Sequence, residues 1–268
     1  MLQYLDNSSI LLSMNLPGYT EFSFQSDNIE HSVFRSLTNG PGVLLMHELP
    51  GMTPEFLKLA KRIFDAGFTV FLPLLFGNPN ETAVISDTFH VCISREFKCL
   101  ANHESSPITH WLRALSRRID SENLGARGVG AIGLCLTGGF VLSLMIEPHL
   151  MAPVISEPAL PLLAFTDEAK AALGVDPEEL NIAVAREIPL LGLRFSGDQI
   201  CPELRFATLC ARFGNKFERI EIDSSPGNKF GIRPRAHAVL TNDYNDAVGT
   251  PTRAALERII SFLKTNLK

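Results

Sequence analysis

One cysteine stands where the chain could place a nucleophile. The apolar run Val129–Leu134 predicts a buried strand, and the segment Gly133-Leu134-Cys135-Leu136-Thr137-Gly138 then turns toward a helix. A strand, a glycine-flanked residue and a helix form the nucleophile-elbow arrangement, here with cysteine in place of serine. Gly133, Gly138 and Gly139 supply the room that so tight a turn needs. We therefore interpret Cys135 as a nucleophile.

The predicted position of Cys135 also bears on its ionisation. Unpaired amides and the dipole at a helix N-terminus favour the thiolate over the thiol. The alternative for any cysteine is a small buried hydrophobe, and it suffices for the other four cysteines, Cys92, Cys99, Cys201 and Cys210. Thiol redox chemistry is a further alternative for Cys135, but no second cysteine lies at C-x-x-C spacing from it. Neither a disulfide framework nor a metal site is expected.

A thiol nucleophile needs a base and an acid that orients the base, and both follow it along such a chain. Asp198 comes after an apolar strand at 189–195, so it could orient a histidine. His237 lies between the last apolar strand and the closing helix, where the general base is expected. Asp223 is the reserve candidate for the acid. The alternatives are a turn aspartate and a solvent-facing loop histidine.

The loop after the first parallel strand reads Met46-His47-Glu48-Leu49-Pro50-Gly51. Such a loop donates one amide to an oxyanion hole, and the residue after the nucleophile donates the other. We assign these amides to Leu49 and Leu136. Glu48 would then project into the site, where its carboxylate could hydrogen-bond the thiol and control its ionisation. The alternative for Glu48 is a surface loop acid.

The rest of the chain supplies elements that can hold these residues. An N-terminal antiparallel hairpin is predicted at 19–25 and 29–37. Apolar strands then alternate with amphipathic helices, which predicts an α/β fold with a mostly parallel central sheet and helices on both faces. The strands are expected at 42–46, 69–75, 129–134, 153–155, 189–195 and 217–222, and the helices at 54–66, 108–119, 136–146, 203–213 and 252–267. Residues 1–268 are expected to form one domain.

One segment does not fit the alternation. Residues 158–188 contain two short helical patterns, at 167–173 and 177–186, and are longer than a usual connection. This helical insertion is interpreted either as a lid or cap over the carboxyl ends of the strands or as ordinary surface helix.

The composition and charge of the chain exclude several classes of binding partner. The chain has 268 residues, 46% of them apolar, and a net charge of −5 without a basic stripe, which argues against nucleic acid. Without a signal-peptide pattern in residues 1–17 or about 18 consecutive apolar residues, we expect a cytoplasmic protein and no membrane span. Gly128, Gly130 and Gly133 match G-x-G-x-x-G, but they precede and occupy a strand instead of following it, so no dinucleotide cofactor is expected.

These residues together resemble the dienelactone hydrolase family, from about Gly42 to the C-terminus. The likeness is strongest in Gly133-Leu134-Cys135-Leu136, in the Glu48 loop, and in Gly197-Asp198 with Pro202. It implies an α/β-hydrolase fold and a Cys135, His237 and Asp198 triad. It also implies that Glu48 interacts with the thiol and that the Leu49 and Leu136 amides form the oxyanion hole. Family members hydrolyse dienelactone, an enol lactone that carries a carboxylate, through a thiol ester.

Three features depart from the family pattern: Thr137 stands where glycine is usual, residues 238–241 lack the arginine that holds the substrate carboxylate, and the 158–188 insertion is added. Arg233 and Arg235 are candidates to replace that arginine. We expect a cofactor-free hydrolase of a small-molecule ester or lactone, as a monomer or small homo-oligomer. The alternative is a catalytically silent relative that binds a ligand or a protein.

Overall fold

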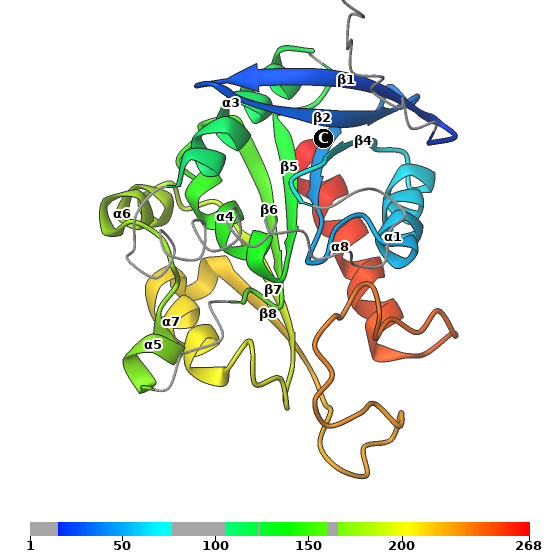
Figure 1. The fold of residues 1–268 in the computed structure, drawn as a ribbon. Helices are drawn as coiled ribbons and strands as arrows, with labels where there is room; N and C mark the ends of the chain where they lie inside the picture. Colours follow the sequence, from blue (N-terminus) through cyan, green and yellow to red (C-terminus); the bar gives the residue numbers. More distant parts are fainter. Residues whose placement is uncertain (1–15, 77–105, 123, 160–165) are drawn as a thin grey trace, which may run out of the picture.

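The structure is a computed structural model that describes residues 16–76, 106–122, 124–159 and 166–268. An eight-stranded sheet in the order β1-β2-β4-β3-β5-β6-β7-β8 runs through it (Figure 1). Its strands are β1 (Tyr19–Ser26), β2 (Ile29–Ser36), β3 (Gly42–Met46), β4 (Thr69–Pro73), β5 (Val129–Leu134), β6 (Leu150–Ser156), β7 (Leu190–Phe195) and β8 (Phe217–Ile222). Strands β3 to β8 pair in parallel, whereas β2 is antiparallel to β1 and β4. The predicted fold class, including the N-terminal hairpin at the sheet edge, is confirmed.

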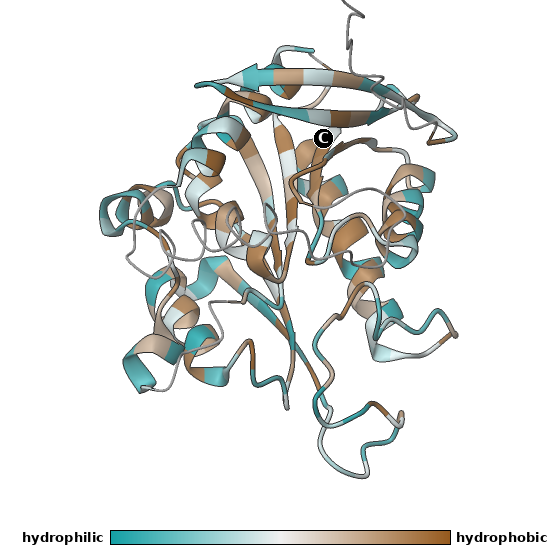
Figure 2. Ribbon diagram, viewed as in Figure 1, coloured by the Kyte–Doolittle hydropathy of each residue, from teal (hydrophilic) through white to brown (hydrophobic). Residues whose placement is uncertain are grey.

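Helices cover both faces of the sheet (Figure 1). One face carries α3 (Pro107–Ser121), α4 (Leu136–Leu144), α6 (Pro177–Ala185) and α7 (Glu203–Phe213), and the other carries α1 (Pro54–Asp65) and α8 (Pro251–Leu267). A hydrophobic core lies on each side, and the hydropathy colouring shows brown strands between helices whose outer surfaces are teal (Figure 2). The two-sided burial explains why the central strands read as continuous apolar runs.

Local sequence sets several boundaries. The hairpin turn consists of Asp27 and Asn28, whose φ values of 50° and 62° suit the two-residue turn between twisted antiparallel strands. Helix α1 begins at Pro54, and the Thr53 hydroxyl accepts a hydrogen bond from the Phe56 amide at 3.2 Å. Strand β6 is longer than predicted because Leu150 already pairs with β5.

The insertion is described from residue 166 onward. Helix α5 (Asp167–Ala171) contacts α7, and α6 buries Leu180 and Ala183 beside α4. The Arg186 guanidinium donates to the Met145 carbonyl at 2.7 Å. Helix α6 thus has the packing of an ordinary surface helix. Residues 160–165 lie outside the described residues, and a lid over the site stays a prediction.

The described residues form no helix that is long and apolar enough to cross a membrane. They also contain no group of three histidine, cysteine or acidic side chains arranged to hold a metal ion. Cys92 and Cys99 lie outside the described part of the chain.

Candidate active site

The parallel register of the strands brings the candidate site residues together at one edge of the sheet. Met46 of β3 pairs with Gly133 of β5, and Leu134 of β5 pairs with Ser156 of β6. Because parallel strands end on the same side, the residues that follow these pairs become neighbours. Cys135 therefore lies between the loop of Glu48 and the residue that follows Ser156, Glu157.

The strand-to-helix turn expected at Cys135 is present. Cys135 has φ 52° and ψ −121°, a sparsely populated conformation for a residue with a side chain. A Cβ atom at Gly133 would lie 2.2 Å from the Thr137 carbonyl oxygen, and one at Gly138 would lie 3.0 Å from the Pro158 Cα. Glycine is thus required at 133 and strongly favoured at 138, which is why the elbow can be read from sequence.

Thr137 has a structural explanation in this elbow. Its buried hydroxyl accepts a hydrogen bond from the Leu134 amide at 2.9 Å. The same hydroxyl lies 2.9 Å from the Leu134 carbonyl and 3.2 Å from the Met46 carbonyl, to either of which it can donate. It therefore joins the elbow to the end of β3.

The predicted acid and base are in contact. His237 Nδ1 lies 2.6 Å from Asp198 Oδ2, and Asp198 is 4% exposed. The other oxygen, Oδ1, accepts the amides of Ile200 and Cys201 at 2.9 and 3.1 Å. The reserve acid Asp223 instead accepts the Ser225 amide in its own turn at 2.8 Å. Asp198 is therefore the orienting acid that the geometry supports.

The second nitrogen of His237 and the thiol are not hydrogen-bonded to each other. His237 Nε2 is buried and has no hydrogen-bond partner among the described residues. Burial, followed by the charges of Glu48 and Glu157, raises the pKa of the Cys135 thiol well above its usual value, although the Leu136 amide lowers it. Burial and the nearby carboxyl groups therefore oppose the thiolate that the helix N-terminus is expected to favour.

Glu48 lies inside the site and not on the surface. It is 5% exposed, and the Thr241 hydroxyl donates to its Oε1. Burial raises the pKa of its carboxyl group. Leu49, half-buried, follows it, and its amide and that of Leu136 come from the two loops expected to form an oxyanion hole. Glu48 is therefore not a surface acid, whereas the oxyanion role of the Leu49 and Leu136 amides stays a prediction.

His47 holds this loop from behind, which the sequence did not indicate. The fully buried imidazole donates from Nδ1 to the Glu48 carbonyl at 3.0 Å. Its Nε2 accepts the Leu75 amide at 3.0 Å, so the geometry assigns a neutral ring with the proton on Nδ1. Burial lowers the pKa of His47 to about 4. The loop after β3 is therefore tied to the segment after β4.

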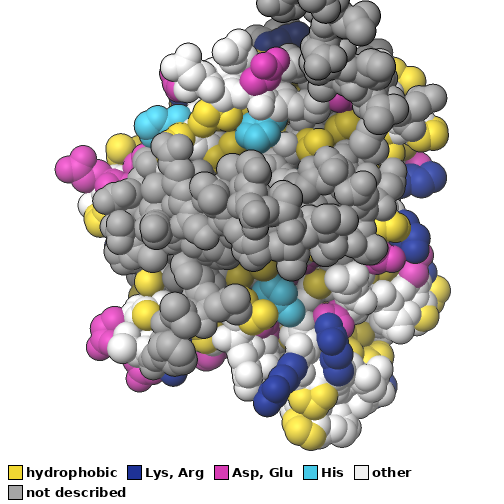
Figure 3. Space-filling view, viewed as in Figure 1, with side chains coloured by type: hydrophobic (Ala, Val, Ile, Leu, Met, Phe, Trp, Pro, Cys, Tyr) yellow, Lys and Arg dark blue, Asp and Glu magenta, His cyan; other side chains and the backbone are white. Residues whose placement is uncertain are grey.

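A long loop between β8 and α8 carries His237. Asp243 accepts the amides of His237 and Ala238 at 3.0 and 3.2 Å and binds Arg233 through both of its oxygens, at 2.7 and 3.0 Å. Arg233 is thus engaged in holding the loop, whereas Arg235 is exposed. In the space-filling view, Lys and Arg side chains gather over the outer part of this loop (Figure 3).

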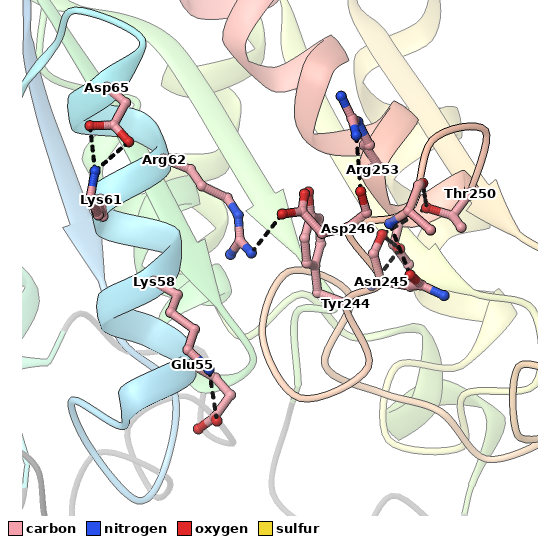
Figure 4. Close-up of polar contacts among 12 residues, drawn as sticks. Glu55, Lys58, Lys61, Arg62, Asp65, Tyr244, Asn245, Asp246, Thr250 and Arg253 are labelled. Atoms are coloured by element: carbon pink, nitrogen blue, oxygen red, sulfur yellow. Dashed lines mark hydrogen bonds and ion pairs between the residues drawn. The ribbon is translucent and has the colours of Figure 1, made fainter.

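The other end of the loop is fastened to α1 (Figure 4). The Arg62 guanidinium lies 4.4 Å from the centre of the Tyr244 ring and 3.5 Å from Asp246 Oδ2. The Tyr244 hydroxyl donates to Asp246 at 2.9 Å, and Thr250 donates to the Asn245 carbonyl at 2.7 Å. These contacts fix where the loop meets the body of the molecule.

The model of the dienelactone hydrolase family matches residues 31–267. The chain belongs to the dienelactone hydrolase family. It is accordingly a hydrolase of carboxylic ester or lactone bonds. No curated protein sequence matches the chain.

Solved structures agree with the family's fold at low identity. A Klebsiella pneumoniae protein described as a dienelactone hydrolase has a TM-score of 0.62 and 18% identity, over 92% of this chain and 98% of that one. A cold-adapted esterase from an Arctic intertidal metagenomic library has a TM-score of 0.61 and 15% identity, over 95% and 97%. Dienelactone hydrolase from Anabaena variabilis has a TM-score of 0.61 and 14% identity, over 94% and 100%.

Two buried charged residues of this dienelactone hydrolase family member were missed by sequence reasoning. Glu157 follows β6 at the same sheet edge, and an acid directly after an apolar strand was the available signal. Arg205 of α7 donates to the carbonyls of Pro158, Ala172 and Ile200 at 2.7, 2.9 and 3.1 Å. It links the insertion to the loop after Asp198, and nothing in its helical spacing indicated this.

Proposed function

We propose that this member of the dienelactone hydrolase family cleaves its ester or lactone through a Cys135, His237 and Asp198 triad. The observation that carries the proposal is the 2.6 Å contact between His237 Nδ1 and Asp198 Oδ2, at the sheet edge that also holds the strained turn of Cys135. A nucleophile, an acid and a base in this order along the chain suit nucleophilic catalysis without a cofactor.

The first half of the proposed reaction forms a thioester. Rotation of the Cys135 side chain brings Sγ toward His237 Nε2, which accepts the thiol proton while Asp198 stabilises the imidazolium. Sγ attacks the carbonyl carbon, and the Leu49 and Leu136 amides donate to the oxyanion. The intermediate collapses, and the leaving alkoxide takes the proton from His237.

The second half regenerates the thiol. His237 removes a proton from water, and the hydroxide attacks the thioester carbonyl carbon. The carbon–sulfur bond breaks, the acid product leaves, and the thiolate recovers the proton from His237. Burial and then the nearby carboxyl groups raise the pKa of the free thiol, so we expect the proton transfer to His237 to accompany substrate binding.

The substrate's charge is a narrower part of the proposal. Arg233 is engaged by Asp243, so Arg235 is the better candidate to hold a substrate carboxylate. Burial and the carboxyl groups of Glu48 and Asp198 oppose a negative charge near the Cys135 thiol. We infer that any carboxylate of the substrate lies toward Arg235, away from the reacting carbonyl.

Replacement of Cys135 by alanine tests the nucleophile. We expect C135A to lower the turnover of p-nitrophenyl acetate by at least about 10³-fold, because no other thiol can take its place in the elbow. The exposed Cys210 on α7 provides the control, and C210A should retain wild-type turnover. Mass spectrometry after brief incubation with p-nitrophenyl acetate should find an acyl group on Cys135.

Two results would contradict this function. Full ester turnover by C135A would exclude Cys135 as the nucleophile. A folded wild-type protein that turns over no member of a panel of esters and lactones, and carries no acyl group on Cys135, would instead support the catalytically silent relative.

A further inference from the structure

Glu157 lies beside the nucleophile in a conformation that few residues adopt. It follows β6, is fully buried, and has φ 36°. Its amide donates to the Leu193 carbonyl of β7 at 2.7 Å. Its neighbours hold the main chain of Cys135 on both sides, since the Cys135 amide donates to Ser156 and the Ala159 amide donates to Cys135, each at 3.0 Å.

The Glu157 carboxyl group reaches the loop that carries the base. Its Oε2 accepts the Ser156 hydroxyl and the Val239 amide, the latter at 3.4 Å. Val239 is only two residues beyond His237. The other oxygen, Oε1, is buried without a hydrogen-bond partner in the described part of the chain. One oxygen is thus used to hold the loop, and the other is left over.

Burial and the surrounding charges together affect the ionisation of the Glu157 carboxyl group. Burial, and then the neighbouring carboxyl groups of Glu48 and Asp198, raise the pKa of Glu157 well above its usual value. The thiols of Cys135 and Cys201 also lie within electrostatic range. The nearby cation, Arg205, donates to the carbonyls of Pro158, Ala172 and Ile200, and within the described residues it makes no hydrogen bond to Glu157. The surroundings therefore favour the neutral acid.

We propose that Glu157 is a positioning residue for the reaction, and that its neutral carboxyl group holds the loop of His237 through the Val239 amide. The inference rests on the proposed function for the reaction that His237 serves. It adds a third loop, the one after β6, to the groups that orient the base.

A neutral Glu157 carboxyl group avoids two energetic costs at this position. An ionised Glu157 would place another negative charge next to a sulfur atom that must itself become negative. It would also leave a buried charge with only two hydrogen-bond donors. A neutral carboxyl group still accepts the Val239 amide through its carbonyl oxygen, so the loop is held without that cost.

Two substitutions separate the contact between Glu157 and the Val239 amide from the ionisation of the Glu157 carboxyl group. E157Q keeps an oxygen that can accept the Val239 amide but cannot ionise, whereas E157A removes the contact. E147Q is the matched control, because Glu147 is a buried glutamate beyond the opposite end of α4 from Cys135. The readouts are kcat and KM for p-nitrophenyl acetate from pH 5 to 10 and the thermal midpoint, Tm, over the same range.

We expect E157A to lower kcat at least tenfold with little change in KM, because the base is displaced while the substrate pocket is kept. E157Q should retain kcat within about threefold at pH 7 and lose the alkaline decline in activity that ionisation of Glu157 causes in the wild type. E147Q should follow the wild-type pH profile. If E157A does not fold, E157D, which withdraws the carboxyl group by one methylene, takes its place.

The Tm measurement tests Glu157 independently of turnover. With its pKa raised in the folded state, the stability linked to the Glu157 proton is present at low pH and is lost as pH rises above 4.5 toward the raised value. E157Q should therefore gain Tm relative to the wild type as pH increases. If the wild type hydrolyses no ester, the proposed function fails, whereas this gain would still support a neutral Glu157.

Two outcomes overturn the inference. One is an E157A variant with wild-type kcat and pH profile, which would show that the contact with Val239 does not position the base. The other is an E157Q variant whose Tm runs parallel to that of the wild type across the pH range, which would show that Glu157 is not held as the neutral acid.

Discussion

Thr137 shows how one hydroxyl group can hold a tight turn. The family usually has glycine at this position of the elbow, whereas this chain buries a threonine whose hydroxyl contacts the main chain of Leu134 and Met46. The side chain therefore fastens the turn of Cys135 to the strand that leads to Glu48. A glycine there could not make this connection.

Removal of the Thr137 hydroxyl should destabilise the protein. T137V keeps the shape of the side chain but leaves the buried Leu134 amide without its acceptor, which we expect to cost about 1–3 kcal/mol in the free energy of unfolding. Urea denaturation measures this cost. The control is T208V, since the Thr208 hydroxyl bonds only the Leu204 carbonyl of its own helix. Equal stability of T137V and the wild type would show that the hydroxyl contributes nothing.

Single residues differ in how far the sequence predicts them. The elbow of Cys135 could be predicted because a steric requirement fixes glycine at 133. Asp198 and His237 could be placed by their order after strands. The raised pKa of Cys135 could not be predicted, because it comes from burial and then from the carboxyl groups of Glu48 and Glu157, which only the strand register brings near the thiol.

At the scale of elements, the loop after β3 depends on a neutral histidine. His47 accepts the Leu75 amide and donates to the Glu48 carbonyl, so it joins the loops after β3 and β4. Protonation of Nε2 would abolish the acceptor and bury a charge. The element that presents Glu48 and Leu49 is therefore sensitive to acid.

Substitution of His47 should change how the stability of the protein falls at acidic pH. Its pKa is lowered to about 4, so the folded state resists protonation and the wild type loses stability as pH falls from 6.5 toward 4. H47Q does not titrate, so its Tm should fall less steeply over this interval. The exposed His110 gives the control, and H110Q should follow the wild type. Parallel curves for H47Q and the wild type would disprove this role.

Strands and helices were easier to predict than the segment after β6. Periodicity reveals an element that buries one face, as α1 and α3 do, whereas the short α5 has no buried residue. The lid interpretation of 158–188 rested on the length of the segment and on its expected position above the carboxyl ends of the strands. Helix α6 packs beside α4, and the Arg186 contact that fixes it there joins residues about forty positions apart in the sequence.

At the scale of the whole molecule, one sheet divides two cores. Leu115 of α3 belongs to the core on one face, and Leu263 of α8 belongs to the core on the other. Because all eight strands form a continuous sheet, loss of either core would expose the apolar strands that both cores share. We therefore propose that the described chain unfolds as one cooperative unit.

Core truncation on each face tests that cooperativity. L115A and L263A should each cost about 2–5 kcal/mol in the free energy of unfolding and shift the same transition. Fluorescence of Trp111, the chain's single tryptophan, reports the α3 face, and far-ultraviolet circular dichroism reports the whole. The I260A control, at a partly buried position of α8, should cost less. Separate transitions for the two probes would contradict a single domain.

The loop that carries His237 also offers a place for engineering. Its outer part is organised by Asn228, whose side chain accepts the amides of Phe230 and Ile232 and donates to the carbonyls of Ser225 and Ile232. The contacts that fix His237 lie further along the chain, at Val239, Thr241 and Asp243. A short peptide or a fluorophore attached at the exposed Lys229 would therefore lie on a self-contained turn of the loop that carries His237. Such a label would report on substrate entry while the orientation of His237 is left to other residues.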